Sequence, residues 1–413
     1  MTDEKLYIAL TTQLLVAYRH ARRHKGSSNS CISFSTDLEN GLDELARTIV
    51  SRNYTIKRSV RFAVQSPVLR EVIAANFRDR IPHHYIFDYV NPHLELELID
   101  DCYSCRIGRG TSYGVKRLEH HIRSCSENYT RPCWVLQLDI SGYFMSIDRQ
   151  RLLKKADALM DRIGRKRDAQ GCLLADTYRH QTVAYLLRIV ILHDPLSNCE
   201  VRDRANLLQL LPPSKSLTHS APGVGMPIGN LTSQMLSNLY LNEFCHYVKR
   251  QLHVRHFGEY VDDTFYVGND PQWLLSLVPE VDRYLQTEGL HLNLKKTKLT
   301  NIYHGVSFLG IHLKPFRRYV KKETLKRIHQ QVELLRHVPP SVLADKKVCH
   351  HLLSSANSFL GVLVKTSSYR MRCSLFPNYP MFAIANGAPG MKKFIMKNKD
   401  KRLPGALAHS HKI

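Results

Sequence analysis

The chain has 413 residues, 43% of them hydrophobic, which argues for a globular protein with room for one large core or two to three domains. Lysine and arginine number 59 against 36 acidic residues, a net charge of +23. This excess favours a polyanionic partner, most simply nucleic acid; the plainer alternative is a soluble basic protein without such a partner.

The N-terminal stretch, residues 1–26, starts with acidic residues and lacks a small-residue cleavage site, so it predicts an amphipathic helix and no secretory signal. The most apolar segment, "VAYLLRIVIL", is interrupted by Arg188 and is too short for a membrane span. Among ten cysteines the only close pair is Cys102 and Cys105, and a single pair does not favour zinc. We therefore expect a reduced, cytoplasmic protein without a membrane segment.

The periodicity of apolar residues predicts mixed secondary structure along the chain. Helical spacing covers most of residues 1–50, and alternation over 54–66 predicts a strand pair, followed by mixed strand and helix to residue 100. A continuous apolar run at 133–141 predicts a strand buried on both faces. The later predicted elements are a partly helical insertion or linker at about 157–220, a helix at 232–251, a hairpin at 258–270, a helix at 271–288, two strands at 305–315 and basic helices beyond 320.

Three aspartates stand where buried strands end. Asp139 closes "WVLQLD", and Asp262 with Asp263 lies at the tip of the hairpin "GEYVDDTFYVGND". Neighbouring carboxylates repel each other, and the pKa of one should rise unless a cation neutralises them. A solvated turn is the plainer interpretation, but apolar residues flank the pair on both sides. Oxygen ligands of this kind suit Mg²⁺, and a two-ion site predicts phosphoryl transfer.

The motifs follow one another as they do in reverse transcriptases. "LQLDISGYF" at 136–144 and "YVDD" at 260–263 resemble the catalytic motifs of that family. "REVIAANFRDR" from Arg70 resembles its finger motif, "CRIGRGTSYG" the next block, "GLHLNLKKTKL" the palm motif with Lys296, and "FLGIHL" the primer grip with Phe308, Leu309 and Gly310. The ordered series spans roughly residues 55–330.

This resemblance implies roles for individual residues. Asp139, Asp262 and Asp263 would be catalytic and, with Ile140, would bind two Mg²⁺ or Mn²⁺ ions. Arg70 and Lys296 would contact the incoming triphosphate, since arginine offers a fork and lysine a point charge. Phe144 matches the aromatic gate that excludes a ribose 2′-hydroxyl, although its neighbour Tyr143 could take that role. Core packing is the alternative for both rings.

One block points to a subclass. Most reverse transcriptases carry Gln-Gly and Ser-Pro pairs where this chain has "GMPIGNLTSQMLSN". The pattern, with Ile228, Gly229 and Gln234 in the nucleotide-binding region, is similar to reverse transcriptases of diversity-generating retroelements, which copy a template RNA with errors at adenines. Replacing a side-chain amide by apolar Ile228 removes a polar contact and so weakens discrimination between base pairs. Ile228 could equally be a core residue.

The resemblance implies an α+β right-hand polymerase. Fingers and palm would cover 1–312, including the insertion at about 157–220. A helical thumb would cover 313–385, and a basic, disordered tail 386–413. The expected activity is RNA-directed, error-prone DNA synthesis from template RNA, primer and dNTPs, in a bacterium or from a phage acting in one, with a small basic accessory protein as partner. Two alternatives stay open: a retron, group II intron-like or phage-defence reverse transcriptase, and a non-catalytic, maturase-like RNA-binding protein.

Overall fold

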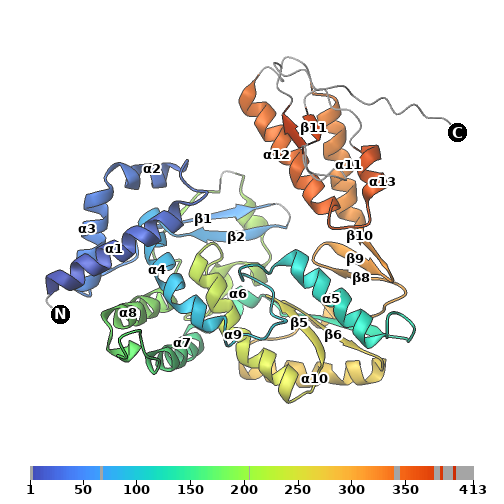
Figure 1. The fold of residues 1–413 in the computed structure, drawn as a ribbon, viewed down its shortest axis with the longest axis horizontal. Helices are drawn as coiled ribbons and strands as arrows, with labels where there is room; N and C mark the ends of the chain where they lie inside the picture. The colour runs from blue at the N-terminus through green and yellow to red at the C-terminus, as the bar shows by residue number, and fades with distance from the viewer. Residues whose placement is uncertain are drawn as a thin grey trace. The chain divides into compact units, whose positions relative to one another are not determined.

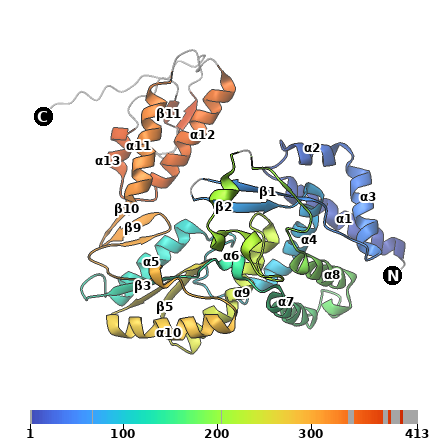
Figure 2. The same cartoon turned by 180° about the vertical axis from the view of Figure 1, so that it is seen from behind.

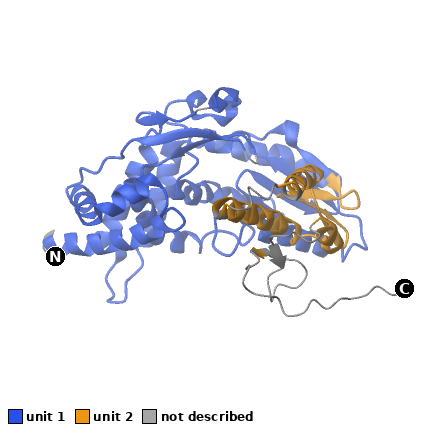
Figure 3. Ribbon diagram, turned by 90° about the horizontal axis from the view of Figure 1, so that it is seen from above, with its two compact units in different colours: residues 1–299 blue, residues 300–413 orange. Residues whose placement is uncertain are grey.

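The chain divides into two compact units, residues 1–299 and 300–413 (Figure 3). A computed structural model describes residues 3–65, 68–203, 205–338, 345–375, 382–384 and 394–396. Within those ranges no helix is both long and apolar enough to cross a membrane.

The first unit begins with helices, as the sequence predicts (Figure 1). These are α1 (Asp3–Arg22), α2 (Asn29–Thr36), α3 (Leu38–Val50) and, after two strands, α4 (Phe77–Leu94). Leu42, Leu45 and Ile49 recur at helical spacing on α3 and are buried, because α1 packs against both α3 and α4 and covers this apolar face.

A small sheet follows, formed by β1 (Ser59–Val64), β2 (Arg70–Ala74) and β4 (Cys199–Val201) in the order β2-β1-β4. β1 and β2 are antiparallel, whereas β1 and β4 are parallel. The prediction of a strand pair within 54–66 was wrong in its bounds, since only β1 lies there and its partner starts at Arg70. Alternation marks a strand, but it does not say where its partner begins.

The central sheet has the order β5-β6-β3-β7, formed by β5 (His256–Tyr260), β6 (Asp263–Gly268), β3 (Trp134–Asp139) and β7 (Lys298–Asn301). The predicted strand at 133–141 is confirmed as β3, with Val135, Leu136 and Leu138 buried. Three helices pack on this sheet: α5 (Thr111–Cys125), α9 (Leu231–Arg250) and α10 (Pro271–Thr287) (Figure 2). The predicted helices at 232–251 and 271–288 are thereby confirmed.

The segment at 157–220 is built into the core of the first unit. After the short α6 (Tyr143–Ser146), α7 (Arg149–Gly164) and α8 (Tyr178–Leu192) pack together and against α9 and α4. Val183, Leu186 and Ile191 of α8 are fully or almost fully buried, and β4 joins the small sheet. The segment therefore contributes apolar area to folding rather than hanging outside the core.

The second unit contains the antiparallel strands β8 (Val306–Phe308), β9 (Ile311–Lys314) and β10 (Arg317–Val320) in the order β10-β9-β8. The predicted helices beyond 320 are α11 (Lys322–Arg336), α12 (Lys346–Leu363) and α13 (Tyr369–Leu375). They enclose a separate core that includes Ile328, Val332 and Leu360. A two-stranded sheet joins β11 (Phe382–Ile384) to β12 (Phe394–Met396), and the rest of the predicted tail at 386–413 lies outside the described residues.

Helices and largely antiparallel sheets in one chain confirm the predicted α+β class.

Candidate active site

The central sheet brings the predicted carboxylates to one end. β3 and β6 run antiparallel in a register that sets Asp139 directly opposite Asp263. The peptide N–H of Ile140 donates to the backbone oxygen of Asp262 at 3.0 Å, so the end of β3 is tied to the hairpin turn. Residues 124 positions apart in sequence therefore become cross-strand neighbours, whose side chains lie close together.

The turn that carries Asp262 is strained. Tyr260 pairs with Asp263, which leaves Val261 and Asp262 as a two-residue turn. Such turns need a positive φ, usually supplied by Gly or Asn, yet here Val261 has a φ of 61°. A β-branched residue in this region costs about 1–3 kcal/mol, and such strain clusters at functional sites.

Charges of both signs act on the carboxyl group of Asp262. Burial raises the pKa of Asp262 above its usual value, and the charge of Asp139 adds to the rise, while Lys296 and Arg70 oppose it. Lys296 donates to both oxygens of Asp139, at 2.7 and 3.0 Å. Partial burial works to lower the pKa of Lys296, but the bond to Asp139 and the three carboxylates raise it overall. A cation is thus already drawn to these carboxylates.

The donor chemistry fits a hard divalent cation. The rise in the pKa of Asp262 caused by Asp139 is the repulsion that such a cation would relieve. Across the described ranges, no three His, Cys, Asp or Glu side chains form a ready-made cage. Mg²⁺ does not require one, because it is commonly held by one or two carboxylates with water and substrate phosphates. Asp139, Asp262 and Asp263 are the residues that would hold it.

Tyr143 and Phe144 face different surroundings. Tyr143 is 3% exposed and its hydroxyl donates to the backbone oxygen of Ser237 at 2.6 Å, so its ring belongs to the core. Phe144 is only partly buried and stands edge-on to Tyr143. Since the Tyr143 ring is held in the core, Phe144 is the better placed of the two to meet a substrate.

The segment with Ile228 contacts strand β2. The N–H of Ile73 donates to the oxygen of Ile228 at 2.9 Å. The Ile228 side chain packs against a small cluster that includes Ile73, Met145 and Leu217, so it also has a packing role. Gly229 has a φ of 134°, and a Cβ there would lie 3.1 Å from the Ile73 oxygen. Only glycine fits this close approach without strain.

The remaining predicted residues are spread more widely. Arg70 is exposed at the start of β2, and its charge acts on Asp262. Gln234 is exposed on the first turn of α9. Phe308, Leu309 and Gly310 form the β8–β9 turn in the second unit, where Leu309 and Gly310 both have positive φ, of 47° and 85°.

Two buried acidic residues, Glu259 on strand β5 of the hairpin and Asp101 in the loop that pairs with β5, were not predicted as part of the site. Glu259 is 1% exposed on β5, and burial raises its pKa to about 7, with the charge of Asp262 adding to the rise. The backbone N–H of Glu259 donates to the backbone oxygen of Asp101, and the backbone oxygen of Glu259 accepts from the backbone N–H of Tyr103. The available signal for Glu259 was its place between aromatic residues in the strand that leads to the aspartate pair.

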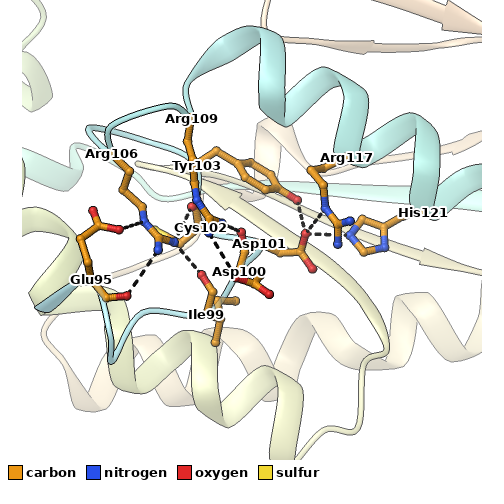
Figure 4. Close-up of polar contacts among 10 residues, drawn as sticks. All are labelled: Glu95, Ile99, Asp100, Asp101, Cys102, Tyr103, Arg106, Arg109, Arg117 and His121. Atoms are coloured by element: carbon orange, nitrogen blue, oxygen red, sulfur yellow. Dashed lines mark hydrogen bonds and ion pairs between the residues drawn. The ribbon is translucent and has the colours of Figure 1, made fainter.

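Asp101 is the centre of a buried polar network (Figure 4). It accepts from Arg117 at 2.8 Å and from the Tyr103 hydroxyl at 2.8 Å, and His121 lies 3.0 Å away. Despite burial, these hydrogen bonds hold the pKa of Asp101 well below its usual range. The network fixes the loop that pairs with β5, and no local sequence pattern signals it.

Residues 191–313 match the family model described as reverse transcriptase (RNA-dependent DNA polymerase). The match covers less than a third of the chain; it includes Asp262, Asp263 and Lys296 but starts after Asp139. Among curated proteins, no sequence matches the chain.

Solved structures give distant similarities. An apo telomerase from Candida tropicalis, truncated from its C-terminal domain, is 10% identical with a TM-score of 0.45, over 64% of this chain and 55% of that one. Telomerase from Candida albicans, in complex with a TWJ fragment of telomeric RNA, is 11% identical with a TM-score of 0.43, over 78% and 57%. The chain thus spans little more than half the length of these proteins. The family match over residues 191–313 indicates the domain of an RNA-directed DNA polymerase, a nucleotidyltransferase.

Proposed function

We propose that this protein is the RNA-directed DNA polymerase of a diversity-generating retroelement, and that it copies a template RNA into cDNA with errors at adenines. The observation that carries the catalytic part is the register that sets Asp139 opposite Asp263, with Asp262 in the strained turn beside them. A protein that only binds RNA has no need for three repelling carboxylates next to a polyanion.

The reaction is the attack of a primer 3′-hydroxyl on the α-phosphorus of a dNTP, which releases pyrophosphate. Two bound Mg²⁺ ions would lower the pKa of the attacking hydroxyl and stabilise the leaving pyrophosphate. Asp139, Asp262 and Asp263 supply the carboxylates, and Ile140 holds the strand end through its bond to the turn. Lys296 neutralises Asp139 before substrate binds. It would then contact the triphosphate, which Arg70 would also bind. Phe144 would exclude a ribose 2′-hydroxyl.

The retroelement assignment rests on "IGNLTSQ". Ile228 sets an apolar side chain where other reverse transcriptases have an amide, and the contact of its backbone with Ile73 fixes it against the finger strand. The same packing against Met145 and Leu217 also supports a structural role. A retron, group II intron-like or phage-defence enzyme is the alternative. The proposed setting is the cytoplasm of a bacterium, with template RNA and a small basic accessory protein as partners.

The division of labour along the chain is part of this proposal. Residues 1–312 would act as fingers and palm, including the insertion at about 157–220. Residues 313–385 would act as the thumb, and Phe308, Leu309 and Gly310 as the primer grip.

Primer extension on an RNA template tests the catalytic part. Asp262→Asn should lower the rate by roughly a thousandfold or more, since it removes several kcal/mol of transition-state stabilisation. Asp157→Asn on α7, an exposed carboxylate more than half accessible, is the control and should leave the rate unchanged. Equal activity of the Asp262 variant and the parent protein would refute the assignment.

Sequencing of the cDNA tests the retroelement part. Errors should concentrate at template adenines, and Ile228→Gln should reduce them while extension continues. An even error spectrum in the parent protein would favour the alternative classes of reverse transcriptase.

A further inference from the structure

Helix α5 has two faces of different character. Its buried face includes Val115, Leu118 and Ile122, and from the same side Arg117 and His121 reach the carboxylate of Asp101 (Figure 4). The opposite face exposes Lys116, His120 and Arg123, spaced four and three residues apart. Residues at this spacing line up along one side of a helix.

These three basic residues line a shallow hollow. The hollow measures about 360 Å³ and is lined by Lys116, Glu119, His120, Arg123, Ser124 and Asn128. Its far wall comes from the turn after α5, where Glu127, Asn128 and Tyr129 all have left-handed backbones, with φ of 49°, 59° and 70°. Three such residues in a row are costly in L-amino acids, and strain of this kind is typical of functional sites.

The turn orients Arg123. The Asn128 side-chain oxygen accepts from Nε of Arg123 at 3.2 Å and from a terminal guanidinium nitrogen at 3.0 Å, and the Asn128 N–H donates to the Arg123 backbone oxygen at 2.8 Å. The partner is neutral, so the guanidinium keeps its charge while its direction is fixed. A pre-oriented guanidinium loses less side-chain entropy when it binds an anion.

The surroundings of the hollow are positive. Within the described ranges Lys116 makes no hydrogen bond or ion pair, and Glu119 is the single acidic residue of the lining. Three basic side chains, Lys116, His120 and Arg123, therefore share the lining with one acidic residue, which favours a local positive potential.

One end of the hollow lies away from the carboxylates. The thiol of Cys125, at the end of α5, donates to Asn269, just beyond β6. Asp263 stands at the opposite end of β6, five residues from Gly268, which corresponds to roughly 17 Å along the strand. Arg123 and Asn128, at this end of α5, therefore lie toward the end of β6 that is opposite the catalytic carboxylates.

We propose that the hollow formed by Lys116, His120, Arg123 and Asn128 binds phosphates of the template RNA backbone outside the catalytic site. A fixed guanidinium, a free ammonium and a histidine along one helix face match successive phosphates of a strand. RNA is the occupant because the chain contains a reverse transcriptase domain, and in this respect the inference rests on the proposed function. The site anchors RNA while the reacting end moves through the active site.

Equilibrium binding of a fluorescent RNA hairpin, in EDTA and without dNTPs, tests the proposal separately from catalysis. Lys116→Gln/Arg123→Gln should weaken binding about tenfold and reduce the salt slope of log K by about 2. Lys154→Gln/Arg165→Gln removes the same charge from exposed positions on and just after α7 and should change neither quantity appreciably. Equal losses in the two variants, or no loss in the first, would overturn the proposal.

Two further measurements identify the occupant. Lysine acetylation of the parent protein, read by mass spectrometry, should show that bound RNA slows the acetylation of Lys116 and leaves that of Lys154 unchanged. Equal protection of the two lysines would refute the site. Polyglutamate should compete weakly with RNA; competition as strong as that of unlabelled RNA would assign the hollow to an acidic protein and overturn the proposal. Extension of a short primer–template, monitored in parallel, reports on the proposed polymerase activity alone.

Discussion

Glu259 makes the stability of this protein depend on pH in a way that one substitution can remove. Its carboxyl lies fully inside the first unit on β5, three residues before Asp262. Burial disfavours the charged form and raises its pKa from 4.5 to about 7, and the charge of Asp262 acts in the same direction. The Cys102 thiol and the Val261 backbone oppose the rise without cancelling it.

The sign and size of this pH dependence follow from the number of protons bound by the folded and the unfolded chain. Below pH 4.5 the carboxyl is protonated in both folded and unfolded chains. Between pH 4.5 and about 7 the unfolded chain releases the proton and the folded chain keeps it, so the free energy of unfolding falls as the pH rises. At about 1.4 kcal/mol per pH unit the loss reaches about 3 kcal/mol near pH 7 and then levels off.

Glu259→Gln keeps the shape of the side chain and cannot ionise, so it should abolish this dependence. Urea unfolding of both proteins at steps from pH 4.5 to pH 8, with EDTA present, measures it. The stability of the variant relative to the parent should increase by about 3 kcal/mol over this range, while contributions from other groups, including Asp262, largely cancel. A difference that stays constant with pH would refute the reasoning, whatever the stability of either protein at a single pH.

Three other substitutions test the packing around the site. Gly229→Ala should lower the free energy of unfolding by about 1–3 kcal/mol, because its φ of 134° and the Ile73 oxygen leave no strain-free place for a Cβ. Thermal unfolding of this variant is compared with that of Gly171→Ala, where φ is also positive but the space is open. The comparison separates backbone strain from the contact with the Ile73 oxygen. Phe144→Ala should raise kcat/KM for ribonucleotides relative to deoxyribonucleotides, and an unchanged ratio would exclude the gate. Glu71→Ala should cost about 3–5 kcal/mol in urea unfolding, because it leaves the largely buried Arg61 without its 2.6 Å partner; a loss below about 1 kcal/mol would contradict this.

The elements that carry the chemistry could be predicted from the sequence alone. Apolar runs ending in Asp139 and in the pair Asp262 and Asp263 predicted strands with carboxylates at their ends, and both strands are confirmed. Such predictions succeed because the period of a strand or helix depends on near neighbours, which the sequence displays directly. The ordered motifs supplied the reverse transcriptase expectation, and the family match supports it over residues 191–313.

Which of these residues meet depends on the packing of the folded chain. Lys296 pairs with Asp139 across 157 positions, and the register of β3 against β6 sets Asp139 opposite Asp263. Glu259, expected only as part of a hairpin, proved to be a buried acid. The basic residues of α5 divide between the buried network around Asp101 and the exposed hollow. Pairings over such separations depend on how whole sheets and helices pack, and no local pattern encodes them.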